Sequence, residues 1–463
     1  MSMMKGFSNA FRIPELRKKI LITLGLVFVC RLVSQIPTPG VDWTALKSAI
    51  DNLRANNAAG GGLLDWFDVF TGGALGQCAI GFLSIWPYIS AQIVIQLLGS
   101  VIPSLEKLKK EGESGRQQLA QITRYLTIVL CIVQSWGIAT MLSHPGALGL
   151  GNVEIVVNPG IGFHLMTVIG MTSAALFVMW LADQITTFGI GNGASLIIMI
   201  NITSRLPQAL ISAWDRYFGV GSTNTNLAEL PILVIFFVLV VMGTVLLTQG
   251  VRKVAIHSTR RSVGGGNTYG MQQTFMPLRV NYTGVMPIIF AQPLLQIPSA
   301  LLMKVFKGSE SAFGQNVYSF AEQLSNPGNV IHMVIYAVLI MFFAFFWVAT
   351  QFNAIDISEN LKKDGSYVPG IRPGRATAEY LDDMMTKITL IGGAGLLVVA
   401  LIPMILMGWM SIPWAIASFF GGTSLLIIVG VALDTLRIME SHLLVRKYEG
   451  FLSHGSLRGR GGM

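Results

Sequence analysis

The chain has 463 residues, of which 52% are hydrophobic and only 12% are charged. A soluble domain carries about twice that charged fraction, so the composition argues against a soluble enzyme or binding module and favours a protein that folds in lipid. The formal net charge of +9 could suggest a nucleic-acid partner. The basic residues instead lie in short segments between apolar runs, which is the pattern of membrane topology signals.

The N-terminus resembles a secretory signal peptide, because a basic stretch ending at Lys19 precedes an apolar run from Ile20. No small-residue cleavage site follows, and residues 34–40 contain two prolines and a glycine in a stiff turn. We therefore expect a retained first transmembrane helix.

Runs long enough to cross a bilayer as a helix, about 20 mostly apolar residues, recur along the whole chain. The ten predicted spans are 20–36, 76–101, 121–142, 163–183, 193–213, 231–250, 284–303, 331–352, 388–408 and 412–433. Pro403 and Pro413 are expected to bracket the turn between the last two. The pattern predicts an all-α, multi-pass membrane protein.

The distribution of Lys and Arg predicts the orientation of the chain, since basic loops stay in the cytoplasm. With the N-terminus inside, 25 of the 32 basic residues fall in cytoplasmic segments and six in outer segments, while Arg31 lies within the first span. Both termini are therefore expected in the cytoplasm.

Three segments between spans are unusual. The amphipathic stretch 63–70 is too short to cross the membrane, and Asp65 and Asp68 would be costly at its centre, so we expect a surface helix or one that dips into a protein-lined cavity. Two cytoplasmic loops, 251–283 and 353–386, are longer than connectivity requires and combine basic residues with turn formers, which is typical of an exposed contact surface.

The chain lacks the residue clusters that catalysis or ion coupling needs. Its six histidines are scattered, and its three cysteines, Cys30, Cys78 and Cys131, lie in apolar runs without metal-site spacing, so we expect inert thiols and no cofactor. Only Arg31 is charged clearly within a span, which disfavours a proton-coupled carrier. Polar residues in or beside the spans are expected to make interhelical hydrogen bonds; they are Gln92, Gln96, Asn192 and Asn201.

Eight short motifs are distributed along the chain: PTPG at 37–40, FTGGAL at 70–75, PYISA at 87–91, LKKEGE at 108–113, GIGNG at 189–193, PLRVN at 277–281, VPGIRPG at 368–374 and GGTSLLI at 421–427. These motifs resemble those of the SecY family of protein-translocation channels and occur in that family's order. Together they extend the resemblance over about residues 10 to 450.

The resemblance implies two pseudo-symmetric five-helix halves around an hourglass pore. The N-terminal half would be 1–213, with a plug helix at about 63–72, and an outer hinge loop would follow at 214–230. The C-terminal half would be 231–440, and 441–463 would be a cytoplasmic tail.

The resemblance also implies roles for individual residues. The apolar pore ring would be Ile85, Ile89, Ala194, Ile198, Ile289 and Ile427. The plug would include Leu64, Asp65, Trp66, Phe67 and Phe70. The lateral gate, through which transmembrane segments leave into lipid, would include Gln92, Gln96 and Asn281. A ring of branched apolar side chains suits a pore for any sequence because a narrow apolar constriction dewets and resists ions. Ala194 is smaller than the residue usual there and should leave a local gap.

The partners implied by the resemblance are SecE-like and SecG-like membrane subunits, the motor ATPase SecA, the ribosome, and signal peptides and preproteins, with membrane lipid at the exit. The docking residues for SecA and the ribosome would be Arg252, Lys253, Arg260, Arg261, Lys362, Lys363 and Arg372. Basic side chains suit ribosomal RNA phosphates, and arginine can also hold a carboxylate bidentately.

The expected function is therefore a protein-conducting channel of the bacterial cytoplasmic membrane, without enzymatic activity of its own. The main alternative is a small-solute or ion-coupled carrier, which should place a charged pair at mid-membrane. A second alternative is a lipid-facing scaffold or insertase, which would lack the opposed isoleucines.

Overall fold

The computed structural model describes residues 13–48, 71–74, 76–144, 155–218, 229–258, 273–306, 308, 311–410, 416 and 422–454. The chain divides into two compact units. Unit 1 comprises 1–57, 66–206 and 431–463, and unit 2 comprises 58–65 and 207–430. The predicted boundaries of the two halves stay a prediction.

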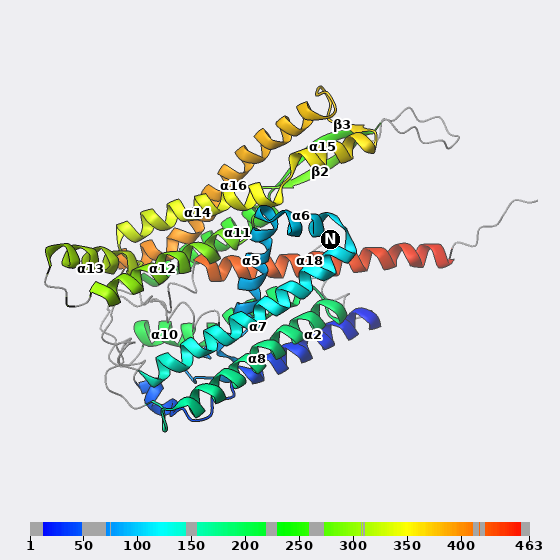
Figure 1. Cartoon of the computed structure of the whole chain (residues 1–463). Coiled ribbons are helices and arrows are strands. Elements are labelled where there is room, and N and C mark those ends of the chain that lie inside the picture. The colour runs from blue at the N-terminus through cyan, green and yellow to red at the C-terminus, as the bar shows by residue number, and fades with distance from the viewer. Residues whose placement is uncertain are drawn as a thin grey trace, which may run out of the picture. The chain divides into compact units, whose positions relative to one another are not determined.

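Unit 1 is built from helices α2 (Pro14–Val33), α5 (Trp86–Val101), α6 (Pro103–Lys110), α7 (Glu113–Ser143), α8 (Ile161–Phe188) and α9 (Gly193–Thr203), with a short 3-10 helix η1 (Ile80–Leu83) before α5 (Figure 1). Proline in the first turn of α2, α5 and α6 costs no helical hydrogen bond and presets the backbone angle. Between α2 and η1, the hydroxyl and backbone N–H of Thr44 and the backbone N–H of Ala45 donate to the carboxylate of Asp42 and hold its pKa below the ordinary value.

Small side chains bring α7 and α8 together within unit 1. Thr127, Cys131, Ser135 and Ala139 recur every four residues along α7 and are all buried. That spacing places them on one face, and small residues let two helix backbones approach closely in a membrane. Cys131 packs there with Met171 and Ala175 of α8, as expected for an inert thiol.

Unit 2 contains α10 (Leu206–Phe218), α11 (Glu229–Gln249), α12 (Met286–Phe306), α13 (Ala312–Ser325), α14 (Val330–Gln351), α15 (Ala354–Lys363) and α16 (Arg375–Met410). The last helix, α18 (Gly422–His454), begins in unit 2 and ends in unit 1. The core of unit 2 joins α11, α12, α14, α16 and the start of α18, with Ile288, Ile340, Leu396 and Leu426 fully buried. Pro403 lies inside α16 and not at a turn, contrary to expectation, because a helix in a membrane tolerates an internal proline.

Helical segments lie within each of the ten predicted spans, and the span 193–213 consists of two helices, α9 and α10. Eight candidate spans are long and apolar enough to cross a membrane within the described residues. The other two positions are held by α2, whose first turns carry charged residues, and by α18. Large apolar side chains such as Leu21 and Phe28 of α2 and Leu246 of α11 are exposed, as is expected for surfaces that face lipid.

A small antiparallel sheet adds to the mostly helical fold. Strands β1 (Val251–Ser258), β2 (Gln273–Arg279) and β3 (Ser366–Tyr367) lie in the order β2-β1-β3, with Val254 opposite Met276 and His257 opposite Tyr367. The two long loops predicted from the sequence, 251–283 and 353–386, are thus joined, because their strands pair in the same sheet.

Candidate functional site

The N-terminal end of α5 carries the first two predicted constriction residues. Ile85 caps the helix and Ile89 follows one turn later, with the Ile89 N–H donating to the Ile85 carbonyl at 3.1 Å. Their side chains are buried, at 3% and 7% exposure. A spacing of four residues places both on one face of α5.

Ala194 and Ile198, the next two predicted ring residues, lie near the start of α9, also four residues apart, and both are partly buried. Asn192 caps α9 by accepting a hydrogen bond from the Ser195 N–H at 3.2 Å. The glycine-rich turn before it needs glycine, because Gly191 has a φ of +87° and a Cβ at Gly193 would overlap the Ala182 carbonyl. This string is a tight helix junction, as predicted.

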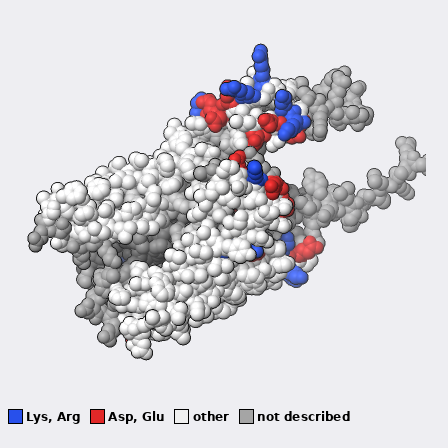
Figure 2. All heavy atoms as spheres, viewed as in Figure 1, with Lys and Arg blue, Asp and Glu red and all other residues white. Residues whose placement is uncertain are grey.

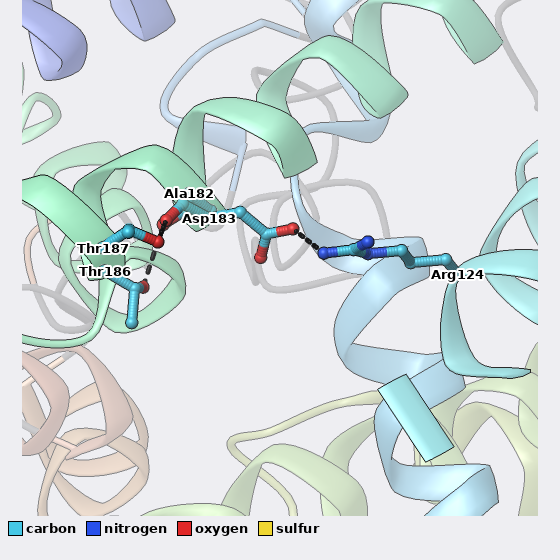
Figure 3. A network of polar contacts seen from close by, with 5 residues as sticks. All are labelled: Arg124, Ala182, Asp183, Thr186 and Thr187. Carbon is cyan, nitrogen blue, oxygen red and sulfur yellow. Dashed lines mark hydrogen bonds and ion pairs between the residues drawn. The ribbon is translucent and has the colours of Figure 1, made fainter. Parts of the chain in front are cut away.

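An ion pair that the sequence did not predict holds α8 to α7 near this turn (Figure 3). Arg124 Nη2 lies 2.7 Å from Asp183 Oδ2, and both side chains are partly exposed. Thr186, one turn beyond Ala182, donates to its carbonyl, and its hydroxyl oxygen accepts from the Gly193 N–H at 2.9 Å. The start of α9 is therefore tied to the end of α8.

In unit 2, Ile289 lies in the first turn of α12 and Ile427 in the first turns of α18, at 4% and 2% exposure. Their neighbours Ile288 and Leu426 belong to the central core cluster of unit 2, whereas Ile289 and Ile427 are not members of that cluster. The convergence of all six predicted ring residues stays a prediction.

The predicted lateral-gate residues occupy two elements. Gln92 is exposed and Gln96 partly buried, one turn apart on α5. Asn281 is buried in the turn before α12, where its Oδ1 accepts from the Thr283 hydroxyl at 3.3 Å. The plug residues Leu64, Asp65, Trp66, Phe67 and Phe70 lie outside the described residues, as do Arg260 and Arg261.

The other five predicted docking residues lie on one structure within unit 2. Arg252 and Lys253 are exposed on β1, Lys362 and Lys363 are exposed in the last turn of α15, and Arg372 is exposed in the turn before α16. Figure 2 shows charged side chains gathered over the end of unit 2 that carries α15 and the sheet, whereas its visible surface around α13 and α14 is white.

A compact apolar core supports this basic surface. Val254 and Leu278 of the sheet pack with Phe352, Val368 and Leu381. The turn at 368–374 is ordered by hydrogen bonds, since the Ile371 N–H donates to the Val368 carbonyl at 3.1 Å and the Thr377 hydroxyl to the Arg372 carbonyl at 2.9 Å. The Arg372 side chain is thus presented from a fixed turn.

The five docking residues differ from other cations nearby in having no ion-pair partner within the described part of the chain. Arg375 pairs with Glu379 at 3.0 Å, and Lys387 pairs with Asp383 at 2.6 Å, each within α16. The unpaired cations remain available for an external anionic partner.

The sequence also did not predict the hydrogen-bonded cluster around Arg31 of α2. Arg31 donates to Asn201 Oδ1 at 3.2 Å and to the Gly72 carbonyl at 3.3 Å, and Asn201 Nδ2 donates to Ser84 Oγ at 2.9 Å. Asn201 makes the interhelical contacts expected of it. The only sequence signals were a charge within a span and a polar residue on an apolar helix.

The family model described as SecY matches residues 79–436. A protein translocase subunit SecY from Streptomyces scabiei is 40% identical over 454 residues, covering 97% of this chain and 100% of the relative. The chain belongs to the SecY family. A SecY from Escherichia coli K12 is 38% identical over 448 residues, covering 96% of each chain.

Solved structures show the SecY fold as well. The structure of a protein conducting channel has a TM-score of 0.60 at 15% identity and covers 92% of this chain and 93% of its own. Sec61 in the canine ribosome-channel complex has a TM-score of 0.56 at 16% identity, with coverage of 92% and 93%. The SecY family consists of channels and not of enzymes, and the chain is accordingly a multi-pass channel subunit of a protein translocase.

Proposed function

We propose that this chain is the path by which unfolded secretory polypeptides cross the bacterial cytoplasmic membrane, and that it releases transmembrane segments sideways into lipid. The observation that carries the proposal is the 40% identity to a translocase subunit over almost the whole of both chains. The buried isoleucines at 85, 89, 289 and 427 support an apolar pore ring, completed by Ala194 and Ile198.

In this proposal α5 separates from α12 when a client leaves sideways, with Gln92, Gln96 and Asn281 along the opening and the plug at about 63–72 filling the idle pore. We expect oxidation of an Ile89→Cys, Ile289→Cys pair to stop a secretory client, and reductant to restore its passage. The background should lack Cys30, Cys78 and Cys131, all of which are buried free thiols.

Each single cysteine variant serves as the control, because oxidation should not affect it. A disulfide needs Cβ atoms within about 4.5 Å, so efficient cross-linking also tests the predicted proximity. If the bond forms fully and translocation continues at the same rate, the lateral-gate assignment is wrong.

The surface formed by Arg252, Lys253, Lys362, Lys363 and Arg372, with Arg260 and Arg261, would dock the SecA motor and the ribosome. SecE-like and SecG-like subunits would complete the assembly, and both termini would face the cytoplasm. The five described cations of this docking surface have no internal ion-pair partner within the described residues, unlike Arg375 and Lys387. They can therefore neutralise phosphates or carboxylates of a partner without first breaking an internal ion pair, which supports the docking role.

Arg372→Ala tests the docking surface. Loss of one charge-assisted contact should slow SecA-driven translocation about tenfold or more without changing the amount of folded protein. Arg375→Ala is the matched control, because that arginine lies three residues away but pairs with Glu379 on its own helix. Equal effects of the two substitutions would argue against a specific role for Arg372.

A further inference from the structure

Arg31 is a charged side chain in the last turn of α2 whose contacts are neutral oxygens. It is half-buried and donates to Asn201 of α9 and to the carbonyl of Gly72. Among the described residues no carboxylate pairs with it. A charge at membrane depth costs free energy unless its hydrogen-bond donors are satisfied. The hydrogen bonds to these two oxygens therefore stabilise the position of Arg31, and with it the end of α2.

The guanidinium of Arg31 fixes the orientation of the Asn201 amide. Because arginine can only donate, the amide oxygen must face it, and the amide NH₂ must point away. That NH₂ donates to the hydroxyl oxygen of Ser84 at 2.9 Å. Asn201 and Ser84 are almost fully buried, at 1% and 4% exposure, so neither contact has water as a ready substitute.

Ser84 has a backbone conformation that rarely suits a residue with a side chain, with φ 45° and ψ −133°. Such a conformation persists only where surrounding contacts hold it. The hydrogen bond from Asn201 is one such contact. The Ser84 N–H donates to the Gly81 carbonyl, and η1 rests against the end of α2, where a Cβ at Gly81 would lie 2.8 Å from the Val33 carbonyl.

The network ends next to predicted constriction residues on both of its sides. Ser84 directly precedes Ile85, and Asn201 lies three residues after Ile198 and seven after Ala194, on the same face of α9. One hydrogen-bonded chain therefore connects the turn that positions Ile85 to the helix face that carries Ile198.

We propose that Arg31, Asn201 and Ser84 form a positioning network that holds the turn at 80–85 against α2 and α9 and thereby sets how tightly the idle pore excludes ions. The inference rests on the proposed channel function and names residues that act on the constriction without being part of it. If the network were purely stabilising, its loss would lower the stability of the whole unit and leave ion leak unchanged relative to an equally destabilised control.

The test uses the intact translocase containing the full chain, reconstituted in lipid vesicles. The variants are Asn201→Ala, Ser84→Ala and the double substitution, and the readouts are ion leak through the idle channel and amide hydrogen exchange of residues 80–85. Ser135→Ala is the matched control, because this buried hydroxyl on α7 bonds to Cys131 and Thr172 and not to the network.

We expect each single substitution to increase leak and exchange at 80–85 about tenfold, the effect of losing one buried hydrogen bond, and the double substitution to do no more than either single. Asn201→Asp should restore the seal, because a carboxylate accepts from both Arg31 and the Ser84 hydroxyl. Ser135→Ala should leave leak unchanged.

Additive effects of the two single substitutions, or leak no greater than in Ser135→Ala at equal stability, would overturn the inference. Faster, non-additive hydrogen exchange at residues 80–85 without any change in ion leak would also overturn the inference. The network would then hold the turn without setting how tightly the idle pore excludes ions. Failure of the proposed function itself is seen separately, as an unsubstituted chain that passes no secretory client in the same vesicles.

Discussion

Gly72 lies between Arg31 of α2 and the carboxyl end of α9, in a backbone conformation with φ +67°. A Cβ there would be 2.5 Å from Arg31 Nη1 and 2.9 Å from the Asn201 carbonyl oxygen. Gly72→Ala should therefore destabilise the protein by about 1–3 kcal/mol, through overpacking and an unfavourable φ. The measurement is the fraction of monodisperse protein that remains after heating in detergent.

Gly25→Ala is the control for that substitution, since nothing lies within 4 Å of a Cβ at Gly25 in the middle of α2. Alanine in an open helical position should be neutral or stabilising by about 0.5–1 kcal/mol. Equal melting of the two variants would show that the space around Gly72 adapts at little cost.

Single residues were predictable from the sequence only in part. The FTGGAL motif placed Gly72 in the family pattern, and Asn201 was expected to make an interhelical hydrogen bond. The positive φ of Ser84 was not predictable, because serine normally avoids that region and only the contacts of folded neighbours hold it there.

At the scale of elements, polar contacts join the end of α10 to the start of α11, the two helices that residues 219–228 connect. Arg216 Nη2 lies 3.8 Å from Glu229 Oε2, and the Tyr217 hydroxyl donates to the same oxygen at 3.3 Å. The charged side chains are only 15% and 17% exposed, so solvent screens the pair weakly.

Glu229→Gln should loosen this junction, because it removes the charge that Arg216 and Tyr217 share. We expect a loss of about 1–3 kcal/mol, seen as faster hydrogen exchange in α10 and the first turn of α11. Glu322→Gln on α13, an exposed position, is the control and should have no effect. Unchanged exchange in Glu229→Gln would show that apolar packing alone holds the two helices.

The elements themselves were largely predictable, because ten apolar runs of spanning length leave few alternatives to helix. The sheet was not predicted. Its strands combine basic residues with the alternating Val254 and Ile256, whose side chains are buried only when distant parts of the chain fold together. Val254, for example, belongs to the same core cluster as Val368, more than 100 residues later. Alternation over so few residues is a weak signal beside the turn-forming composition of the same loops.

At the scale of the whole molecule, the sequence predicted two halves and an orientation. The contacts group the chain into two compact units, and the terminal part of α18 belongs to unit 1, where Met439 and Leu443 pack on Leu16, Ile20 and Ile190. Periodicity along α18 could not have predicted this, because the contact partners all lie in the first half of the chain.

Orientation in the membrane gives a prediction that depends on the charge distribution of the entire chain. Lys47 lies on the predicted outer side and Lys362 on the predicted cytoplasmic side, and both are exposed. In a background without the three native cysteines, a membrane-impermeant thiol reagent added to intact cells should label Lys47→Cys. It should label Lys362→Cys only after the membrane is opened.

The physical reason is that basic segments resist transfer across the membrane potential, so the 25 of 32 basic residues in the predicted cytoplasmic segments should keep the loops around Lys362 inside. Labelling of Lys47→Cys only after permeabilisation would place its loop on the cytoplasmic side and contradict the predicted orientation, and a Trp43→Cys variant provides a second exposed probe of the same loop. Labelling of Lys362→Cys in intact cells would invert the topology and place the basic surface where neither SecA nor a ribosome could reach it.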